Sequence, residues 1–383
     1  MRYLTAGESH GKCLTAIIEG VPAGLSISAD EINLELGRRQ QGYGRGGRMK
    51  IEQDKAEIVS GVRFGVTLGS PMTLIIANRD WDNWQETMAA NGSPAGYPVT
   101  APRPGHADLT GVLKYDRDDV RDILERASAR ETAARVAVGS VARRLLASVS
   151  IRVAAHVVNI GGVGISTPRP ALPELMAARS SSELACIDRD AEAAMKIAID
   201  QARAAGDTLG GIFEIVAEPL LPGIGSHVHW DRRLDTRLTA AVMSIPAIKG
   251  VEFGAGFGYA ALPGSQAHDE IFYIPGEGYT RSSNRAGGLE GGMTNGEPLI
   301  MRAVMKPIPT LMQPLRSVDL VTREPWLANT ERSDVCAVPA AAVVGEAMTA
   351  IVLAQALLEK FGGDCLDDML AAVEHYRQRI AHK

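Results

Sequence analysis

The sequence predicts one large domain of mixed α/β (α+β) class spanning residues 1–383. Short stretches rich in β-branched residues, typical of strands, alternate with apolar residues at helical spacing. The sequence shows no repeat, no low-complexity segment and no shift in composition that would mark a linker. Its 40 glycines are spread through loops over the whole length. We therefore expect the loops of one domain to converge on one site, although the length alone would suit about two to three domains.

Two strands joined by a tight turn are predicted at the N-terminus. A short strand leads into Gly7, and residues 14–20 form a second strand rich in β-branched side chains. Gly7 and Gly11 bracket the connection between them. That connection displays Glu8, Ser9 and His10. A hairpin turn with a solvated histidine explains this segment as well as a functional site does.

A helix over residues 29–40 is predicted to run into a basic, glycine-rich loop. Ser28 and Glu31 fit a capping box at the start of this helix. Residues 38–50 hold four arginines and one lysine on a backbone with four glycines. They would suit a mobile lid over a multiply charged anion, because guanidinium donors match phosphate and carboxylate. A solvated run of charge is the alternative, with its first two arginines only compensating the helix C-terminus.

Two strands, a long loop and two helices are predicted next. Strands are expected at residues 57–64 and 72–77, a loop at 78–105, and helices at 118–126 and 131–148. We expect the loop to be mobile, because loops this long in compact proteins are usually functional or disordered. It ends in a rigid turn that presents His106 beside Asp108. The segment from Arg126 to Thr132 suits an anion at a helix N-terminus, and an ordinary capped helix explains it equally well.

The rest of the chain is predicted to alternate strands and helices. Strands are expected at 151–160, 212–217 and 299–305, and helices at 190–205, 231–243 and 340–361. The last helix is apolar on most faces, with Pro339 at its start and Gly362 at its end, so we place it in the core or at a subunit contact. Residues 282–296 are too rich in glycine for a regular element.

Composition excludes several functional classes. The apolar fraction of 45%, the charged fraction of 22% and the net charge of −5 fit a soluble globular protein, not a nucleic-acid binder. Aromatic residues, at 5%, are too few for a base-stacking surface. The four cysteines form no C-x-x-C pair, and His227 and His229 have no third ligand nearby in sequence, so no metal site is predicted. We found no signal peptide and no apolar run of about 18 residues, so we expect no membrane association and a cytoplasmic location.

Seven loops share small residues, Arg or Lys, and a lone His or acidic residue, which is the composition of a cationic pocket. These loops are residues 7–11, 38–50, 103–108, 126–130, 284–296, 306–310 and 332–334. Histidine supplies or accepts a proton near neutrality. We found no G-x-S-x-G elbow and no phosphate-binding P-loop. The residues thus indicate an enzyme that acts on a polyanionic small molecule by acid–base chemistry, and a phosphorylated cofactor would suit the same charge.

Four segments resemble the signature motifs of chorismate synthase. They read Gly7-Glu8-Ser9-His10-Gly11, Arg103-Pro104-Gly105-His106-Ala107-Asp108, Arg126-Ala127-Ser128-Ala129-Arg130-Glu131-Thr132-Ala133 and Arg332-Ser333-Asp334-Val335-Cys336-Ala337-Val338-Pro339. The loops at 38–50 and 284–296 are similar to the same family. The similarity runs in order from Met1 to about Gly363. So many motifs in order are far more specific than any one of them.

This resemblance implies an enzyme of the shikimate pathway. The family converts 5-enolpyruvylshikimate 3-phosphate to chorismate and phosphate by an anti 1,4-elimination, the seventh and last common step toward the aromatic amino acids. It requires reduced FMN, although the reaction has no net redox change. The implied fold is a β-α-β sandwich unlike the Rossmann type, and the implied assembly is a homotetramer. We expect a monofunctional, bacterial-type member; a bifunctional form with intrinsic NADPH-dependent flavin reductase activity is the alternative.

The resemblance also implies roles for individual residues. The positions that match the substrate clamp are Arg39, Arg45, Arg48 and Arg130. The family links the positions of Arg39 and Arg45 to NADP as well. His10 matches the acid that protonates the leaving phosphate, and His106 matches the histidine that protonates reduced flavin. Asp334 matches an acid near flavin N5 that relays the proton.

The implied FMN site draws on several segments. Its positions are Arg126, Ala127, Ser128, Ala247, Gly291, Lys306, Pro307, Ile308, Pro309, Thr310 and Arg332. Ser9 and Ser128 are further hydrogen-bonding helpers. Two residues depart from the family's pattern. Pro246 stands where many members carry Gln, which removes a side-chain amide contact, and Pro309 stands where others often carry a small residue.

Overall fold

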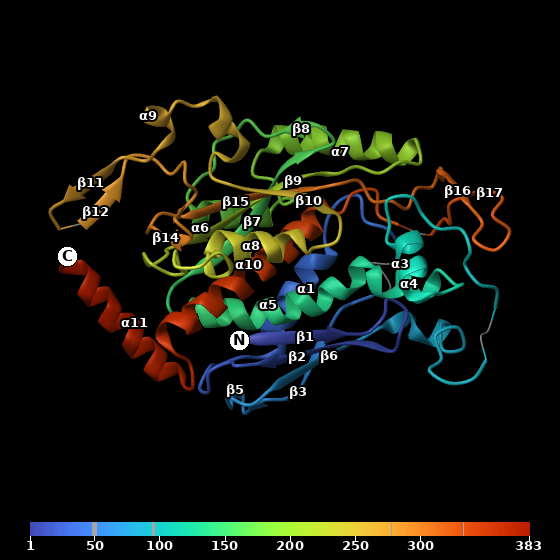
Figure 1. Cartoon of the computed structure of the whole chain (residues 1–383), viewed down its shortest axis with the longest axis horizontal. Coiled ribbons are helices and arrows are strands. Elements are labelled where there is room, and N and C mark those ends of the chain that lie inside the picture. Colours follow the sequence, from blue (N-terminus) through green and yellow to red (C-terminus); the bar gives the residue numbers. More distant parts are fainter. Residues whose placement is uncertain (48–51, 94–95, 277, 332) are drawn as a thin grey trace.

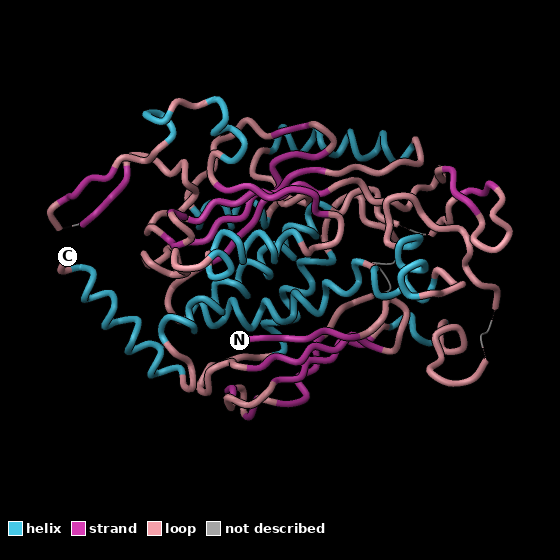
Figure 2. The backbone as a smooth tube through the Cα atoms, in the orientation of Figure 1, coloured by secondary structure: helices cyan, strands magenta, loops and turns pink. Residues whose placement is uncertain are grey.

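Two antiparallel sheets enclose a layer of helices (Figure 1, Figure 2). The computed structural model describes residues 1–47, 52–93, 96–276, 278–331 and 333–383. The order of the layers confirms the expected β-α-β sandwich. Every pairing between neighbouring strands of these two sheets is antiparallel, so the fold is not a Rossmann type, which is built on parallel strands.

The first sheet is formed by the N-terminal part of the chain. Its strands, in spatial order, are β1 (Arg2–Ala6), β2 (Cys13–Glu19), β6 (Met72–Ala77) and β3 (Ala56–Ser60). Burial alternates along β2, because successive side chains of a strand point to opposite faces. Leu14 and Ile18 therefore face the helices, whereas Ile17 and Leu4 of β1 are exposed on the outer face.

The second sheet comes from the middle of the chain. Its strands, in spatial order, are β10 (Ile248–Phe253), β15 (Leu299–Met305), β9 (Gly211–Glu218), β7 (Arg152–Ile160) and β8 (Val163–Gly164). Two further helices, α6 (Leu172–Ser180) and α7 (Arg189–Ala204), lie on the far side of this sheet in Figure 1. The sheet is therefore covered on both faces, which explains why β9 is almost entirely buried.

Four helices form the middle layer. They are α1 (Ala29–Gln40), α5 (Thr132–Ala147), α8 (Leu234–Met243) and α10 (Val338–Phe361). The predicted capping box starts α1: Ser28 accepts from the backbone N–H of Glu31, whose side chain accepts from the backbone N–H of Ser28. One hydrophobic cluster joins residues of all four helices and both sheets, so the layers share a single core.

Helix α10 is the centre of that core. By length and composition it could cross a membrane, which corrects our expectation that no apolar stretch is long enough. However, 89% of its most apolar window is buried inside the protein, as in the core helix of a soluble domain. Its one buried carboxylate, Glu346, lies among three arginines.

The smaller elements account for the differences from the predictions. Helix α4 (Arg121–Ala127) matches the helix expected at 118–126, but α3 (Asp108–Tyr115) and α11 (Leu366–Ala381) were not predicted. The glycine-rich residues 282–296 do contain a hairpin, β13 (Leu289–Glu290) and β14 (Met293–Thr294). Strands of two residues are too short to leave a periodic pattern. The other short elements are β4 (Val62–Arg63), β5 (Val66–Thr67), η1 (Arg79–Asn83), η2 (Ala129–Glu131), η3 (Trp230–Arg232), η4 (Gly256–Ala261), α9 (Gly264–Ala267), β11 (Ile271–Ile274), β12 (Gly278–Arg281), β16 (Arg316–Val318) and β17 (Pro325–Leu327).

Candidate active site

A cavity of about 470 Å³ lies where several loops meet the ends of α1, α4 and α10. Six of the seven cationic loops contribute to its lining, and the loop at 284–296 does not. The chain therefore brings together segments that lie as far apart in sequence as Ser9 and Val344. Within the described part of the chain, no group of three or more His, Cys, Asp or Glu side chains could hold a metal ion.

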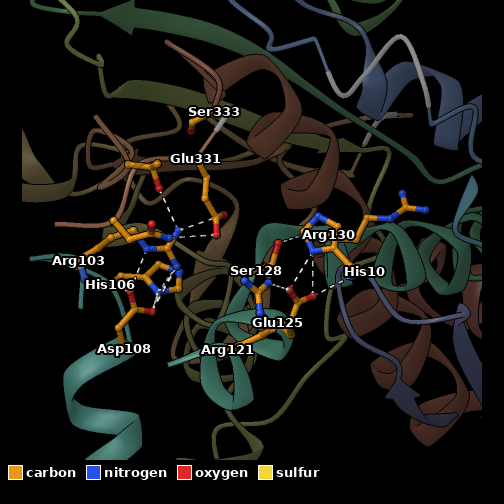
Figure 3. A network of polar contacts seen from close by, with 12 residues as sticks. His10, Arg103, His106, Asp108, Arg121, Glu125, Ser128, Arg130, Glu331 and Ser333 are labelled. Carbon is orange, nitrogen blue, oxygen red and sulfur yellow. Dashed lines mark hydrogen bonds and ion pairs between the residues drawn. The ribbon is translucent and has the colours of Figure 1, made fainter. Parts of the chain in front are cut away.

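On one side of the cavity, His106 is paired with the buried carboxylate of Asp108 (Figure 3). Asp108 also accepts from Nε of Arg103 at 2.9 Å. Burial alone would raise the pKa of Asp108, but hydrogen bonds from His106 and Arg103 hold it well below its usual range. The carboxylate is therefore ionised and can only accept hydrogen bonds. Nδ1 of His106 consequently carries a proton, and Nε2 remains available to a ligand in the cavity.

A second histidine–carboxylate pair is formed by His10 and Glu125 (Figure 3). Nδ1 of His10 lies 2.9 Å and 3.0 Å from the two carboxylate oxygens. Burial would raise the pKa of Glu125, but the hydrogen bond from His10 lowers it below the ordinary value. Both histidines line the same cavity. The cavity thus holds two imidazoles, each oriented by its own ionised carboxylate.

Two buried arginines, Arg39 and Arg130, flank the carboxylate of Asp54. Nη1 of Arg130 donates to Asp54, and Nη2 of Arg39 lies 3.5 Å from it. Burial, together with the charges of Arg130 and Arg45, lowers the pKa of Arg39 to about 10. Among the described residues, Nε and Nη2 of Arg39 and Nη2 of Arg130 are buried without a hydrogen-bond partner. The two Nη2 atoms still lie near carboxylates, that of Arg39 at 3.5 Å from Asp54 and that of Arg130 at 3.6 Å from Glu52. Both arginines line the cavity, and a guanidinium suits a phosphate or carboxylate there.

Asp334 fastens the described part of the basic loop to the rim of the cavity. It pairs with Nη1 of Arg45 at 2.8 Å and accepts from the backbone N–H of Gly46 at 2.6 Å. The backbone turns toward this position at Gly44, which has a φ of +86°. Glycine adopts this conformation without the strain that a side chain would cause. The carbonyl of Gly44 in turn accepts from the backbone N–H of Val335.

A family model described as chorismate synthase matches residues 1–358. The chain belongs to the chorismate synthase family. It is 60% identical to the chorismate synthase of Trichlorobacter lovleyi, over 98% of both chains, and 61% identical to that of Moorella thermoacetica, over 99% of this chain and all of the relative. A crystal structure of a chorismate synthase superposes with a TM-score of 0.82 at 45% identity, covering 100% of this chain and 98% of the other.

The family's FMN positions fall into three groups in this structure. The positions that line the cavity are Ala127, Ser128, Ala247, Lys306, Ile308, Pro309 and Thr310. Arg126, Pro307 and Gly291 are not among the lining residues. Arg126 donates instead to the carbonyls of Thr5 and Gly7, and Gly291 lies in the turn between β13 and β14. Arg332, like the clamp residue Arg48, lies outside the described residues.

One wall of the cavity combines an apolar surface with a backbone set for close approach. Its apolar side chains include those of Ile245, Met305, Ile308, Ala341 and Val344. Ala247 has a φ of +69°, a conformation that a non-glycine residue rarely adopts. Its carbonyl accepts from the backbone N–H of Lys306. Burial and the nearby Lys249 lower the pKa of Lys306. This wall suits a flat, partly apolar ring system that carries a phosphate.

The sequence analysis missed Glu125 and Asp54, the carboxylates that hold His10 and the two buried arginines. No local signal could have found them, because 115 residues separate His10 from Glu125 and 76 separate Asp54 from Arg130. The acid beside His106 was visible because it lies two residues further along the same turn.

Proposed function

We propose that this protein is a chorismate synthase that eliminates phosphate from 5-enolpyruvylshikimate 3-phosphate to give chorismate. One observation carries the proposal: the arginines Arg39, Arg45 and Arg130 line the same cavity as two histidine–carboxylate pairs. That substrate bears one phosphate and two carboxylates, so it matches several cations at once. The elimination also requires a group that can protonate the leaving phosphate, and histidine does this near neutral pH.

The residues of the chain divide the work as follows. Arg39, Arg45 and Arg130 bind the anionic groups of the substrate and exclude water, which strengthens each charge contact. The electron pair of the allylic C–O bond leaves with the phosphate, and Nε2 of His10 gives a proton to a phosphate oxygen. The C6–H bond of the substrate also breaks, which completes the second ring double bond of chorismate, and this hydrogen leaves on the cofactor side of the cavity. His106 and Asp334 hold and move a proton on the cofactor side of the cavity. Arg48 is proposed for the clamp from the family pattern alone.

Reduced FMN is the proposed cofactor. The apolar wall fits its ring, and Lys306, Thr310 and the backbone of Ala127 and Ala247 would hold the remainder. When bound, it supplies electron density to the reacting system without net redox change. For Arg126, Pro307, Gly291 and Arg332, the proposal rests on the family pattern.

The test is anaerobic turnover. Purified protein is incubated with photoreduced FMN and 5-enolpyruvylshikimate 3-phosphate, and phosphate and chorismate are measured together. We expect equal amounts of the two products; no turnover with reduced FMN would overturn the proposal. A parallel reaction with oxidised FMN and NADPH tests the bifunctional alternative. We expect no product there, because the sequence has no nucleotide fingerprint, and turnover would make the enzyme bifunctional.

We also propose a homotetramer and a cytoplasmic location. Exposed apolar residues on the outer face of the first sheet and on the β11–β12 hairpin, such as Leu4, Ile17 and Tyr279, support an assembly. The four cysteines are unpaired, which is usual in a reducing compartment. The mobile loops expected at about residues 38–50 and 78–105 stay a prediction, and residues 48–50 and 94–95 lie outside the described residues.

A further inference from the structure

Glu125 of α4 fastens His10 and Ser9 of the loop at 7–11, and its neighbour Arg126 holds Gly7 at the start of that loop. The carboxylate of Glu125 accepts from the backbone N–H of His10 at 2.8 Å as well as from Nδ1 of its ring. The backbone carbonyl of Glu125 accepts from the N–H of Ser9 at 3.0 Å. The backbone of Ser9, the backbone of His10 and the imidazole ring of His10 all bond to Glu125. These bonds limit both the position and the rotation of the imidazole.

The face of the His10 imidazole packs against an aromatic ring. The ring of Trp84 stacks on His10, with 4.0 Å between the ring centroids and an angle of 26° between the planes. Arg121 closes the arrangement, because its guanidinium lies 5.0 Å from the centre of the Trp84 ring and 3.4 Å from Glu125. Trp84 belongs to the long loop at 78–105, so a remote segment fixes the plane of the ring.

These contacts leave one edge of the imidazole free. Nδ1 faces an ionised carboxylate and carries a proton. Nε2 has no hydrogen-bond partner among the residues that the structure describes, and His10 lines the cavity. A charged carboxylate at Nδ1 also stabilises the positive charge of a protonated ring. The geometry therefore presents Nε2 as the proton donor.

We propose that Glu125 and Trp84 are the positioning residues of His10, with Glu125 fixing the proton on Nδ1 and Trp84 fixing the plane of the ring. This inference rests on the proposed function, in which His10 protonates the leaving phosphate. A purely structural role for Glu125, as the partner of Arg121 in the i, i+4 pair on α4, is the competing explanation. It predicts changed stability without a change in the chemistry at His10.

The experiment uses Glu125→Gln, which keeps the shape but removes the charge. We expect kcat to fall about 10²-fold with KM changed less than about threefold, because general acid catalysis is lost while the clamp is kept. The alkaline limb of the kcat–pH profile should move to lower pH. Glu125→Asp should recover part of the rate. Asp122→Asn on the same helix is the matched control and should leave kcat unchanged. Asp122 is exposed, and its carboxylate pairs only with Arg117 among the residues that the structure describes.

Further measurements distinguish the ways in which the proposal could fail. In a His10→Ala background, Glu125→Gln should cause no further loss of kcat; an equal loss in both backgrounds would assign Glu125 a structural role. Trp84→Leu should lower kcat while the thermal midpoint, followed by the α-helical circular dichroism signal, changes little. An unchanged kcat would remove Trp84 from the proposal. Absence of turnover in the unmodified protein would defeat the proposed function itself. Reactivity of His10 toward diethyl pyrocarbonate, read by mass spectrometry, would then still test the pairing: equal rates with and without Glu125→Gln would overturn it.

Discussion

Arg38 and Glu346 form a bidentate ion pair, with 2.8 Å between Nη1 and Oε2 and 2.9 Å between Nη2 and Oε1. Glu346 lies fully buried in α10 and also accepts from Arg143 of α5 and Arg179 of α6. Arg38 therefore ties α1 to the core helix and does not line the cavity. Its neighbour in sequence, Arg39, faces the opposite way and does.

The first prediction concerns the stability of this cluster. Glu346→Gln leaves the buried Arg179 without its counter-charge, and it leaves the half-buried Arg38 and Arg143 with Glu35 alone. We therefore expect the free energy of unfolding to fall by about 3–5 kcal/mol. Urea denaturation followed by circular dichroism measures the change. Glu374→Gln in the exposed helix α11 is the control and should stay within about 0.5 kcal/mol of the unmodified protein. Equal effects of the two substitutions would contradict a special role for the buried cluster.

The second prediction is an acid sensitivity with the same origin. Burial alone would raise the pKa of Glu346, but the charges of Arg38, Arg179 and Arg143 hold it well below the ordinary value of 4.5. A carboxylate of this kind stabilises the fold above its unfolded-state pKa, and the contribution is lost as pH falls below that value. Stability should therefore begin to drop as pH falls below about 4.5, and the drop should continue down to the lowered pKa of the folded state. The slope should be clearly smaller in Glu346→Gln, and identical slopes would rule out this carboxylate as the cause.

The third prediction tests the anion clamp. Arg39→Lys keeps one positive charge but loses the planar fork of donors, so we expect affinity for 5-enolpyruvylshikimate 3-phosphate to weaken about 10- to 100-fold. Titration calorimetry measures it directly. Arg203→Lys, at an exposed position on α7, is the matched control. Unchanged binding in Arg39→Lys would place the substrate elsewhere.

The fourth prediction tests proton transfer. His106→Ala and Asp334→Ala should each lose most turnover, about 10²-fold or more, while the proteins still fold. Asp334 also holds Arg45 and Gly46, so Asp334→Asn is needed beside the alanine variant. The amide can still accept from Gly46 but cannot relay a proton. Full activity in Asp334→Asn would limit this residue to fastening the loop.

The fifth prediction concerns the basic loop. We expect trypsin to cut within the basic loop at 38–50 in the free protein and to cut much more slowly when substrate and reduced FMN are both present. Peptide mapping by mass spectrometry follows the cleavage, with an exposed site such as Arg203 as the internal reference. Equal protection of both sites, or of neither, would contradict closure of this loop over bound ligands.

Local chemistry made the histidine turns, the capped helix α1 and the core helix α10 predictable, because spacing and capping act over a few residues. The resemblance to one family supplied the layered fold. Glu125, Asp54 and Trp84 were not predictable, because their partners are set by tertiary packing across long stretches of chain. Helix α11 was missed for another reason. It is largely exposed, with only Met369 and Val373 buried, so its apolar pattern is weak.

The position of α10 in the middle layer has a consequence for biosynthesis. This helix is among the last parts of the chain to leave the ribosome, yet it packs against α1, α5, α8 and the strands β7 and β9. The first sheet packs on α1 and α5, but the apolar inner face of the second sheet lacks its main helix until residue 361 is available. Folding during synthesis cannot close the core early, and the nascent chain is exposed to aggregation over most of its translation. Truncation before α10 should accordingly give an insoluble, chaperone-bound product.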